Sequence, residues 1–267
     1  SSTLLSQAYR ACVLYLNGQY WGVYYIREKV DENFLAQHEN YGPDSFTMLY
    51  RNGEVIMGDT DEGYASLIYF VETHDMTLKE NYDYVCSQIF QAYSGNYDLH
   101  NIKYYKSDAE GSDGKWRWIF YDQDYAFREL GDSVARTVES GYHFISNTLI
   151  RNLLKNPDCR ALYLSRMSEL FSSALSADTV LAKINALYEE SLPEMQRHCE
   201  RWSLSFDNWK YEVDVLRRTV SDSGSIEGLG GLSYGGSRIA QVLANLKSTL
   251  YLTDEEYNKY FGGLSIG

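Results

Sequence analysis

The chain has 267 residues, of which 44% are hydrophobic and 23% are charged, and its net charge is −13 at pH 7. This length accommodates one large domain or a two-lobed one, and the apolar fraction is sufficient for a sizeable core, which excludes a disordered chain. Nonspecific binding to nucleic acid or to an anionic membrane needs basic patches, so the negative charge argues against both. Basic or neutral partners are favoured.

Signals for membrane insertion or export are absent from the sequence as given. It contains no apolar run that approaches the length of a membrane span, and no basic leader with an apolar core precedes Ser1. We therefore expect a soluble fragment that is either mature or trimmed.

Motifs of several other enzyme classes are also absent. The histidines form no His-Glu-x-x-His helix, and the sequence has neither a Gly-x-Ser-x-Gly nucleophile elbow nor a Walker-type phosphate loop. The cysteines lack the Cys-x-x-Cys spacing of zinc and dithiol sites, so we expect buried small apolar residues, although one disulfide is compatible with a secreted protein. The four cysteines are Cys12, Cys86, Cys159 and Cys199.

The amino-terminal part is expected to form strands and then helices. Apolar and aromatic residues predict strands around residues 12–17 and 21–27, joined at Asn17-Gly18, and further strands flanking Asn52-Gly53. A helix is expected after Asp31. Two more helices are predicted over residues 62–74 and 78–93.

Residues 95–127 carry the most informative pattern. Residues 102–106 are β-branched and aromatic, residues 115–121 alternate large rings with other residues, and the acidic, glycine-containing stretch between them has the composition of a turn. This pattern predicts a β-hairpin whose open ends lie together. Four acid and amide side chains would then lie at the mouth of the hairpin: Asp98, Asn101, Asp122 and Asp124.

These four side chains are suited to a divalent metal site. Hard cations prefer oxygen ligands, usually one or two carboxylates with water and phosphate oxygens, and Asn101 and Asp122 can supply such a pair. Asp124 is a second ligand or a support, and Asp98 is placed to accept a proton from an incoming hydroxyl. One alternative is that each residue only forms a turn or a cap. Another is glycoside cleavage with Asp98 as acid and Asp122 or Asp124 as base, against which a metal-binding Asn101 argues.

The group that binds phosphate is expected at the end of the second strand. Arg27 and Lys29 lie there on either side of Glu28, and either basic side chain can reach a phosphate. We assign all three residues to cofactor binding. The alternative for the basic residues is a solvated ion pair with Glu28 or Asp31, which would contribute little.

Beyond Arg128 the sequence changes to long amphipathic segments. Residues 221–237 are rich in glycine and serine without periodicity and are expected to form a flexible loop. Thr253 and Glu256 have the spacing of a capping box, which predicts a short final helix. The other helices are expected over residues 144–154, 160–175, 207–220 and 238–251, and around residues 180–188, where apolar residues recur at i, i+4, i+7 and i+8.

Three blocks of sequence carry a family resemblance. They are LYLNGQYWGVYYIREKVDENFLAQ at residues 14–37, NYDLHNIKYY at residues 96–105 and KWRWIFYDQDYAF at residues 115–127. In this order, before a helical tail, they resemble the spore coat protein H (CotH) kinase family of atypical, secreted protein-kinase-like proteins. Family members usually have further strands upstream of the first block, and we expect these to be missing here.

The resemblance implies a fold and a set of site residues. The fold is α+β, with a two-lobed protein-kinase-like arrangement in a single domain. By resemblance, Asp122 matches the metal-binding acid after the second strand, Asn101 the amide of the catalytic loop and Asp98 the candidate base. The implied parts are a small mixed-sheet lobe at residues 1–94, a catalytic hairpin at 95–127 and a helical part at 128–267 that contains the loop 221–237.

The resemblance also implies an activity. The chain would transfer the γ-phosphoryl group of ATP to serine or threonine of a secreted or cell-envelope protein, with Mg²⁺ or Mn²⁺ as cofactor. It would be a secreted or cell-surface bacterial protein, of the spore-coat type, that neither binds nucleic acid nor inserts into a membrane. The competing hypothesis is a non-catalytic kinase-like module that binds an extracellular protein or glycan, since a fold does not imply a function.

Overall fold

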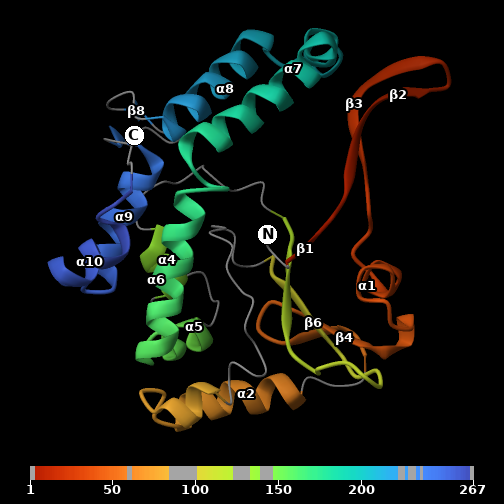
Figure 1. The fold of residues 1–267 in the computed structure, drawn as a ribbon. Helices are drawn as coiled ribbons and strands as arrows, with labels where there is room; N and C mark the ends of the chain where they lie inside the picture. The colour runs from red at the N-terminus through yellow and green to blue at the C-terminus, as the bar shows by residue number, and fades with distance from the viewer. Residues whose placement is uncertain are drawn as a thin grey trace. The chain divides into compact units, whose positions relative to one another are not determined.

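The computed structural model describes residues 4–58, 62–83, 101–122, 133–138, 147–221, 226–227, 233–234 and 237–264 (Figure 1). The chain divides into two compact units. Unit 1 comprises residues 1–7, 28–126 and 133–164, and unit 2 comprises residues 8–27, 127–132 and 165–267. Unit 1 holds a mixed sheet with helices and unit 2 a hairpin with long helices, so the fold class is α+β, as the sequence predicts.

The centre of unit 1 is a five-stranded sheet with the strand order β1-β7-β6-β4-β5. β1 runs parallel to β7, and the other neighbouring pairs are antiparallel, so the sheet is mixed. The predicted hairpin is confirmed as β6 and β7, and it forms the middle of this sheet (Figure 1). The strands are β1 (Leu5–Ser6), β4 (Phe46–Tyr50), β5 (Glu54–Met57), β6 (Lys103–Ser107) and β7 (Arg117–Phe120).

Helices cover both faces of this sheet. Adjacent residues of a strand point to opposite faces, and the neighbouring Tyr104 and Tyr105 of β6 are each only 1% exposed. Tyr104 packs in an apolar cluster with side chains of α2 (Glu62–Thr73) and α5 (Thr148–Leu153). Tyr105 packs in a second cluster with side chains of α1 (Glu32–Glu39). The central strand is therefore buried on both sides.

Local chemistry sets the ends of α1. The carboxylate of Asp31 accepts hydrogen bonds from the backbone N–H groups of Asn33 and Phe34, at 3.0 and 3.2 Å, which satisfies donors that the first turn leaves unpaired. The helix ends at Asn40, which is left-handed with φ 60 and whose N–H bonds the carbonyl of Ala36. This helix follows Asp31, as the sequence predicts.

Unit 2 contains a two-stranded antiparallel hairpin of β2 (Tyr9–Leu16) and β3 (Gln19–Arg27). Asn17 and Gly18 form its turn with positive φ angles of 49 and 77, which an Asn-Gly pair adopts readily. The two strands predicted in this region are thus confirmed, and both are longer than expected.

The β2–β3 hairpin packs on α7 (Ala177–Trp202) through alternating rings and guanidinium groups. The ring centroids of Trp21 and Trp202 are 5.4 Å apart in an edge-to-face arrangement. The guanidinium of Arg197 lies 3.8 Å from the centroid of Tyr20, and that of Arg201 lies 4.3 Å from the centroid of Trp21. These contacts join segments that are about 180 residues apart in sequence.

Most of the predicted helices are confirmed with shifted ends. α6 begins earlier than predicted because the side chain of Asn156 accepts from the N–H groups of Asp158 and Cys159, and Pro157 suits the first turn. Thr253 caps the final helix as predicted, with Oγ1 accepting from Glu256 N at 3.1 Å. The remaining elements are η1 (Pro43–Ser45), α4 (Ser133–Val138), α6 (Pro157–Phe171), α8 (Phe206–Val220), α9 (Arg238–Thr249) and α10 (Asp254–Phe261).

Three predicted segments either differ from the structure or lie partly outside the described residues. Within the glycine-rich stretch 221–237, β8 (Ile226–Glu227) and β9 (Ser233–Tyr234) pair as antiparallel strands, which the lack of periodicity did not predict. Of the helix predicted over residues 78–93, residues 79–83 are helical and 84–93 lie outside the described residues. The helix predicted from residue 144 begins at Thr148, with 144–146 outside the described residues.

The described residues include no helix that is long and apolar enough to cross a membrane. The three cysteines in this part of the chain are free thiols: Cys159 and Cys199 are buried, as expected, and Cys12 is partly exposed. Cys86 lies outside the described residues.

Candidate functional site

The pairing of β6 with β7 brings two of the predicted site residues to the same end of the sheet. Lys103 pairs with Ile119, and the register continues along the hairpin without a shift. Asn101 precedes β6 by two residues and Asp122 follows β7 by two residues. Because antiparallel strands of this register begin and end together, both side chains belong to the mouth of the hairpin.

Asn101 is held by the neighbouring strand. The hydroxyl of Tyr50, the last residue of β4, donates a hydrogen bond to Oδ1 of Asn101 at 2.5 Å. The backbones of the two segments are also hydrogen-bonded next to Asn101, since the N–H of Arg51 donates to the carbonyl of Ile102 at 3.1 Å. The bond from Tyr50 fixes the orientation of the Asn101 amide.

Asp122, two residues after the end of β7, has a left-handed backbone conformation. Its φ is 49, in the left-handed region that few residues other than glycine adopt, although Asp and Asn tolerate it better than most. Five other described residues with side chains adopt the same φ region, so this angle alone does not distinguish a site residue from a turn residue; they are Asn17, Asn40, Arg51, Ser203 and Tyr251.

Lys103 is a third polar side chain at this end, and the sequence reasoning did not identify it. Its ammonium Nζ lies 4.2 Å from the ring centroid of Tyr121, and the side chain is partly buried. Burial lowers the pKa of Lys103, attraction to Asp122 opposes that shift, and repulsion by Lys29 adds to it. The alternation of strand residues predicts which face of the sheet Lys103 points to, but it does not predict which side chains lie next to Lys103.

Lys29, one of the predicted phosphate-binding residues, makes the ion pair that was weighed as its alternative role. Its Nζ lies 3.3 Å from Oδ2 of Asp31, and the lysine side chain is 86% exposed. The pKa of Asp31 is lowered, mainly by the hydrogen bond from the N–H of Phe34 and further by Lys29. The pair is solvent-exposed on the lysine side, so Lys29 can move to another anion at small cost.

Glu28 and Arg27 have different surroundings. Glu28 Oε1 lies 3.3 Å from Nε2 of His38 on α1, and its backbone carbonyl accepts a hydrogen bond from the side-chain amide of Gln7. Arg27 is the last residue of β3, is exposed and pairs with Tyr9 across the hairpin. Arg27 belongs to unit 2, whereas Glu28 and Lys29 belong to unit 1.

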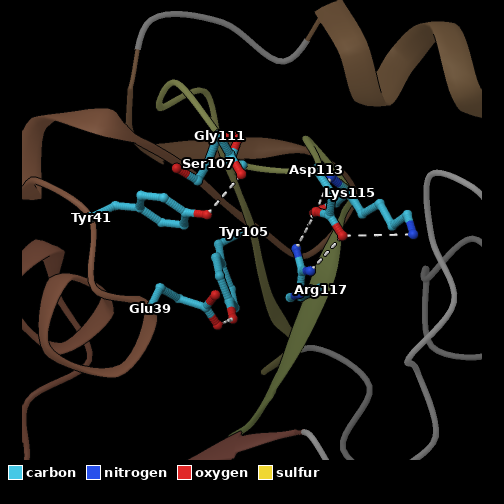
Figure 2. Close-up of polar contacts among 9 residues, drawn as sticks. Glu39, Tyr41, Tyr105, Ser107, Gly111, Asp113, Lys115 and Arg117 are labelled. Carbon is cyan, nitrogen blue, oxygen red and sulfur yellow. Dashed lines mark hydrogen bonds and ion pairs between the residues drawn. The ribbon is translucent and has the colours of Figure 1, made fainter.

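The opposite end of the hairpin is closed by polar contacts (Figure 2). Asp113 receives two hydrogen bonds from the guanidinium of Arg117, at 2.9 and 2.8 Å, which lower the pKa of its carboxyl. The hydroxyl of Tyr105 donates to Oε1 of Glu39 at 2.5 Å, and Tyr41 donates to the carbonyl of Gly111. Burial and the carboxylate of Glu39 raise the pKa of Tyr105. The contacts at this end are structural: they attach α1 to the sheet and fix the loop between β6 and β7.

The other two predicted site residues, Asp98 and Asp124, lie outside the described residues. Among the residues that the structure describes, no group of three or more His, Cys, Asp or Glu side chains gathers as a metal site would require. The described donors are therefore one amide oxygen and one carboxylate. Both are hard oxygen ligands of the kind that Mg²⁺ and Mn²⁺ prefer, so the residues present fit such an ion.

The fold defines the class: an α+β protein with a mixed central sheet, at one end of which lie Asn101, Lys103 and Asp122. Comparison with known proteins is more specific. The family model described as CotH kinase protein matches residues 1–225. The chain therefore belongs to the CotH kinase family, which confirms the resemblance seen in the sequence. No curated protein matches the chain closely enough to count as a relative.

Proposed function

We propose that the chain is a divalent-metal-dependent protein kinase that transfers the γ-phosphoryl group of ATP to a serine or threonine hydroxyl. Membership of the CotH kinase family supports kinase chemistry in general. The observation that carries the specific proposal is the common end of β6 and β7. There Asn101, held by Tyr50, and Asp122 lie at the mouth of one hairpin with Lys103 beside them.

Each side chain at this end has a separate role in the proposal. Asn101 and Asp122 hold Mg²⁺ or Mn²⁺, which when bound neutralises charge on the phosphate oxygens. Asp98 orients or deprotonates the acceptor hydroxyl, and Asp124 supports the site or adds a ligand. Phosphoryl transfer needs little covalent chemistry from the protein, so positioning and charge are the main contributions of these residues.

The basic group of the proposed nucleotide site is Arg27 or Lys29. Lys29 is exposed, and a phosphate can compete with Asp31 for it. Glu28, paired with His38, positions the segment that leads into α1. The acidic net charge of −13 makes such local cations necessary, because a nucleotide is itself an anion.

Family membership supports the proposed substrate class and location. A kinase of this family requires a protein substrate, and we propose a secreted or cell-envelope protein, at the spore coat or cell surface of a bacterium. We further propose that the chain is a single CotH-type domain in a two-lobed kinase-like arrangement.

The proposal is tested with an Asp122→Asn variant. Asparagine keeps the size of the side chain and tolerates the left-handed backbone at this position, so only the charge changes. The matched control is Asp108→Asn at the opposite end of the hairpin, where Asp108 pairs with Lys106 at 2.6 Å. Thermal stability is measured with and without ATP and Mg²⁺ or Mn²⁺, followed by incorporation of labelled γ-phosphate into an acceptor protein.

A metal-dependent rise in stability and phosphate transfer are expected in the parent chain and in Asp108→Asn, and both should be lost in Asp122→Asn. A ligand at 100 times its Kd stabilises the folded state by about 2.7 kcal/mol, which is readily measured. If ATP and metal leave the parent chain unchanged, the kinase proposal fails and the non-catalytic binding module is favoured.

A further inference from the structure

Two exposed arginines on α7 contact aromatic rings rather than carboxylates. The guanidinium of Arg197 lies 3.8 Å from the ring centroid of Tyr20 and 5.7 Å from that of Tyr15. Its Nη1 also donates a hydrogen bond to the hydroxyl of Tyr15 at 3.1 Å. The guanidinium of Arg201 lies 4.3 Å from the ring centroid of Trp21. We call this group the arginine–ring surface, and its members all belong to unit 2: Tyr15, Tyr20, Trp21, Arg197, Arg201 and Trp202.

The two guanidinium groups use little of their hydrogen-bonding capacity within the part of the chain that the structure describes. A guanidinium has five N–H donors in one plane, and contact with a ring occupies its face and leaves the donors at its edge. Among the described residues, Arg197 donates one hydrogen bond, and Arg201 contacts only rings, the second being that of Trp202 at 5.0 Å. No ion pair joins either arginine to a described carboxylate, whereas the exposed Arg166 pairs with Glu169.

The charge of this surface is positive in a chain that is negative overall. Residues 8–27, which form the hairpin, contain two arginines and no Asp or Glu, although the net charge of the chain is −13. Arg197 and Arg201 are four residues apart on one helix, so they lie on the same face, where like charges repel. Glu194 and Glu200 on the same helix lie beyond ion-pair distance of both arginines. A bound anion would therefore relieve the repulsion between the two guanidinium groups.

The arrangement favours two separate anionic groups over one. Each guanidinium contacts its own pair of rings, which disfavours the convergence of both arginines on a single phosphate. Side chains four residues apart on a helix have Cβ atoms about 5–6 Å apart. Side chains on one face of an extended peptide recur about every 6.6 Å, which is a similar spacing. A carboxylate also accepts two parallel hydrogen bonds from a guanidinium, so acidic side chains at alternate positions of a peptide match this surface.

We propose that the arginine–ring surface is a docking site for a protein partner with an extended acidic segment, whose carboxylates at alternate positions bind Arg197 and Arg201. Tyr15 and Trp202 are 50% and 39% exposed, so their rings offer apolar contact beside the two charges. Tyrosine, tryptophan and arginine are the residue types that contribute most to binding at protein interfaces. The ring contacts also hold the arginines in place before binding, which lowers the entropy lost on association. The inference does not depend on the kinase proposal, which uses none of these residues.

The test measures binding of a synthetic peptide of about ten residues, with glutamate at alternate positions and threonine between them, by calorimetry without nucleotide. The same peptide with glutamine in place of glutamate keeps the shape and removes the charge. The parent chain is compared with Arg197→Gln/Arg201→Gln. The matched control is Arg166→Gln/Lys210→Gln, which removes two charges from exposed side chains of unit 2 that already have carboxylate partners, at 2.5 and 2.7 Å. Urea unfolding of the peptide-free proteins is the fold control.

The glutamate peptide should bind the parent chain and the control variant equally, and the glutamine peptide should bind neither. Arg197→Gln/Arg201→Gln should weaken binding of the glutamate peptide by about ten-fold or more, and added salt should weaken it in the parent chain. Equal affinity in the parent chain and in this variant would overturn the proposal. So would a parent chain that binds neither peptide, or one that binds a heparin fragment or a peptide with a single phosphoserine but not the glutamate peptide.

A second variant keeps the test decisive if the loss of both guanidinium groups detaches the hairpin from α7. Arg197→Lys/Arg201→Lys keeps both charges and their attraction to the rings, but an ammonium cannot form the paired, parallel hydrogen bonds of a guanidinium. It should unfold at the same urea concentration as the parent chain and bind the glutamate peptide about three- to ten-fold more weakly. Unchanged affinity in this variant would contradict the role assigned to the two arginines.

Discussion

Replacing Gly22 by alanine should loosen the β2–β3 hairpin from α7. Gly22 has a φ of 126, in a region that residues with a side chain avoid. A Cβ there would lie 2.7 Å from Nδ1 of His198 and 3.0 Å from Nε1 of Trp202. Both nitrogens are already engaged: Val23 N–H donates to His198 Nδ1 at 3.1 Å, and Trp202 Nε1 donates to the carbonyl of Trp21 at 3.0 Å.

Three contributions determine how much Gly22→Ala lowers the free energy of unfolding. The backbone strain of a non-glycine residue in this region costs about 1–3 kcal/mol. The added methyl group overpacks the interface, which costs about 1–3 kcal/mol more. Displacement of the His198 and Trp202 rings weakens two hydrogen bonds worth about 0.5–1.5 kcal/mol each. We therefore expect Gly22→Ala to lower the free energy of unfolding of unit 2 by about 3–9 kcal/mol.

The matched control is Gly18→Ala in the turn of the same hairpin. Gly18 also has a positive φ, 77, but a Cβ there would meet nothing within 4 Å. Gly18→Ala should lower the free energy of unfolding only through strain of the left-handed backbone, by about 1–2 kcal/mol. The assay is urea unfolding followed by tryptophan fluorescence, because the contact of Trp21 with Trp202 at 5.4 Å makes the emission sensitive to docking of the hairpin. Equal destabilisation by the two substitutions would refute the argument, since only Gly22 faces α7.

Three further predictions concern unit 1. Tyr105→Phe should lower the free energy of unfolding by about 1.5–3 kcal/mol in chemical denaturation, because the carboxylate of Glu39 loses its donor; an unchanged midpoint would contradict this. Asp31→Ala should cost about 0.5–2 kcal/mol at pH 7. Because the folded pKa of Asp31 is lowered, its contribution is present above pH about 4 and is lost as the pH falls below that value, so parent and variant should converge in acid. Tyr50→Phe should weaken Mn²⁺-dependent ATP binding about ten-fold without unfolding the protein, because Asn101 loses the bond that orients it; equal affinity would show that Asn101 needs no such support.

The candidate site shows how far local sequence signals extend. The hairpin of β6 and β7 was predictable because ring-rich strands flank a turn of acidic and glycine residues, and its register then placed Asn101 and Asp122 together. The contact of Lys103 with Tyr121 was not predicted, because these side chains come together only after the strands have paired. The sequence pointed to Arg27 and Lys29 because they lie at the end of a predicted strand, which is a local feature.

The buried tyrosines show the same limit. Alternation predicts that Tyr104 and Tyr105 point to opposite faces, but it cannot tell whether either face is covered. A strand at the edge of a sheet, or in an isolated hairpin, would leave one of them exposed. Both are buried because β6 is central and helices cover both faces, which is a property of the assembled unit.

The sequence by itself determined the features that depend on a few neighbouring residues: the Asn17-Gly18 turn, the caps at Asp31 and Thr253, the helical periods and the β6–β7 hairpin with its polar mouth. Only the tertiary structure decided that this hairpin is the centre of a mixed sheet, that β3 packs against α7 and that the ammonium of Lys103 lies over the ring of Tyr121. The reason is physical. Turns, caps and periodicity reflect backbone geometry and hydrogen bonds within one or two turns of chain, whereas packing between distant segments depends on the shape and charge of surfaces that exist only after those segments have folded.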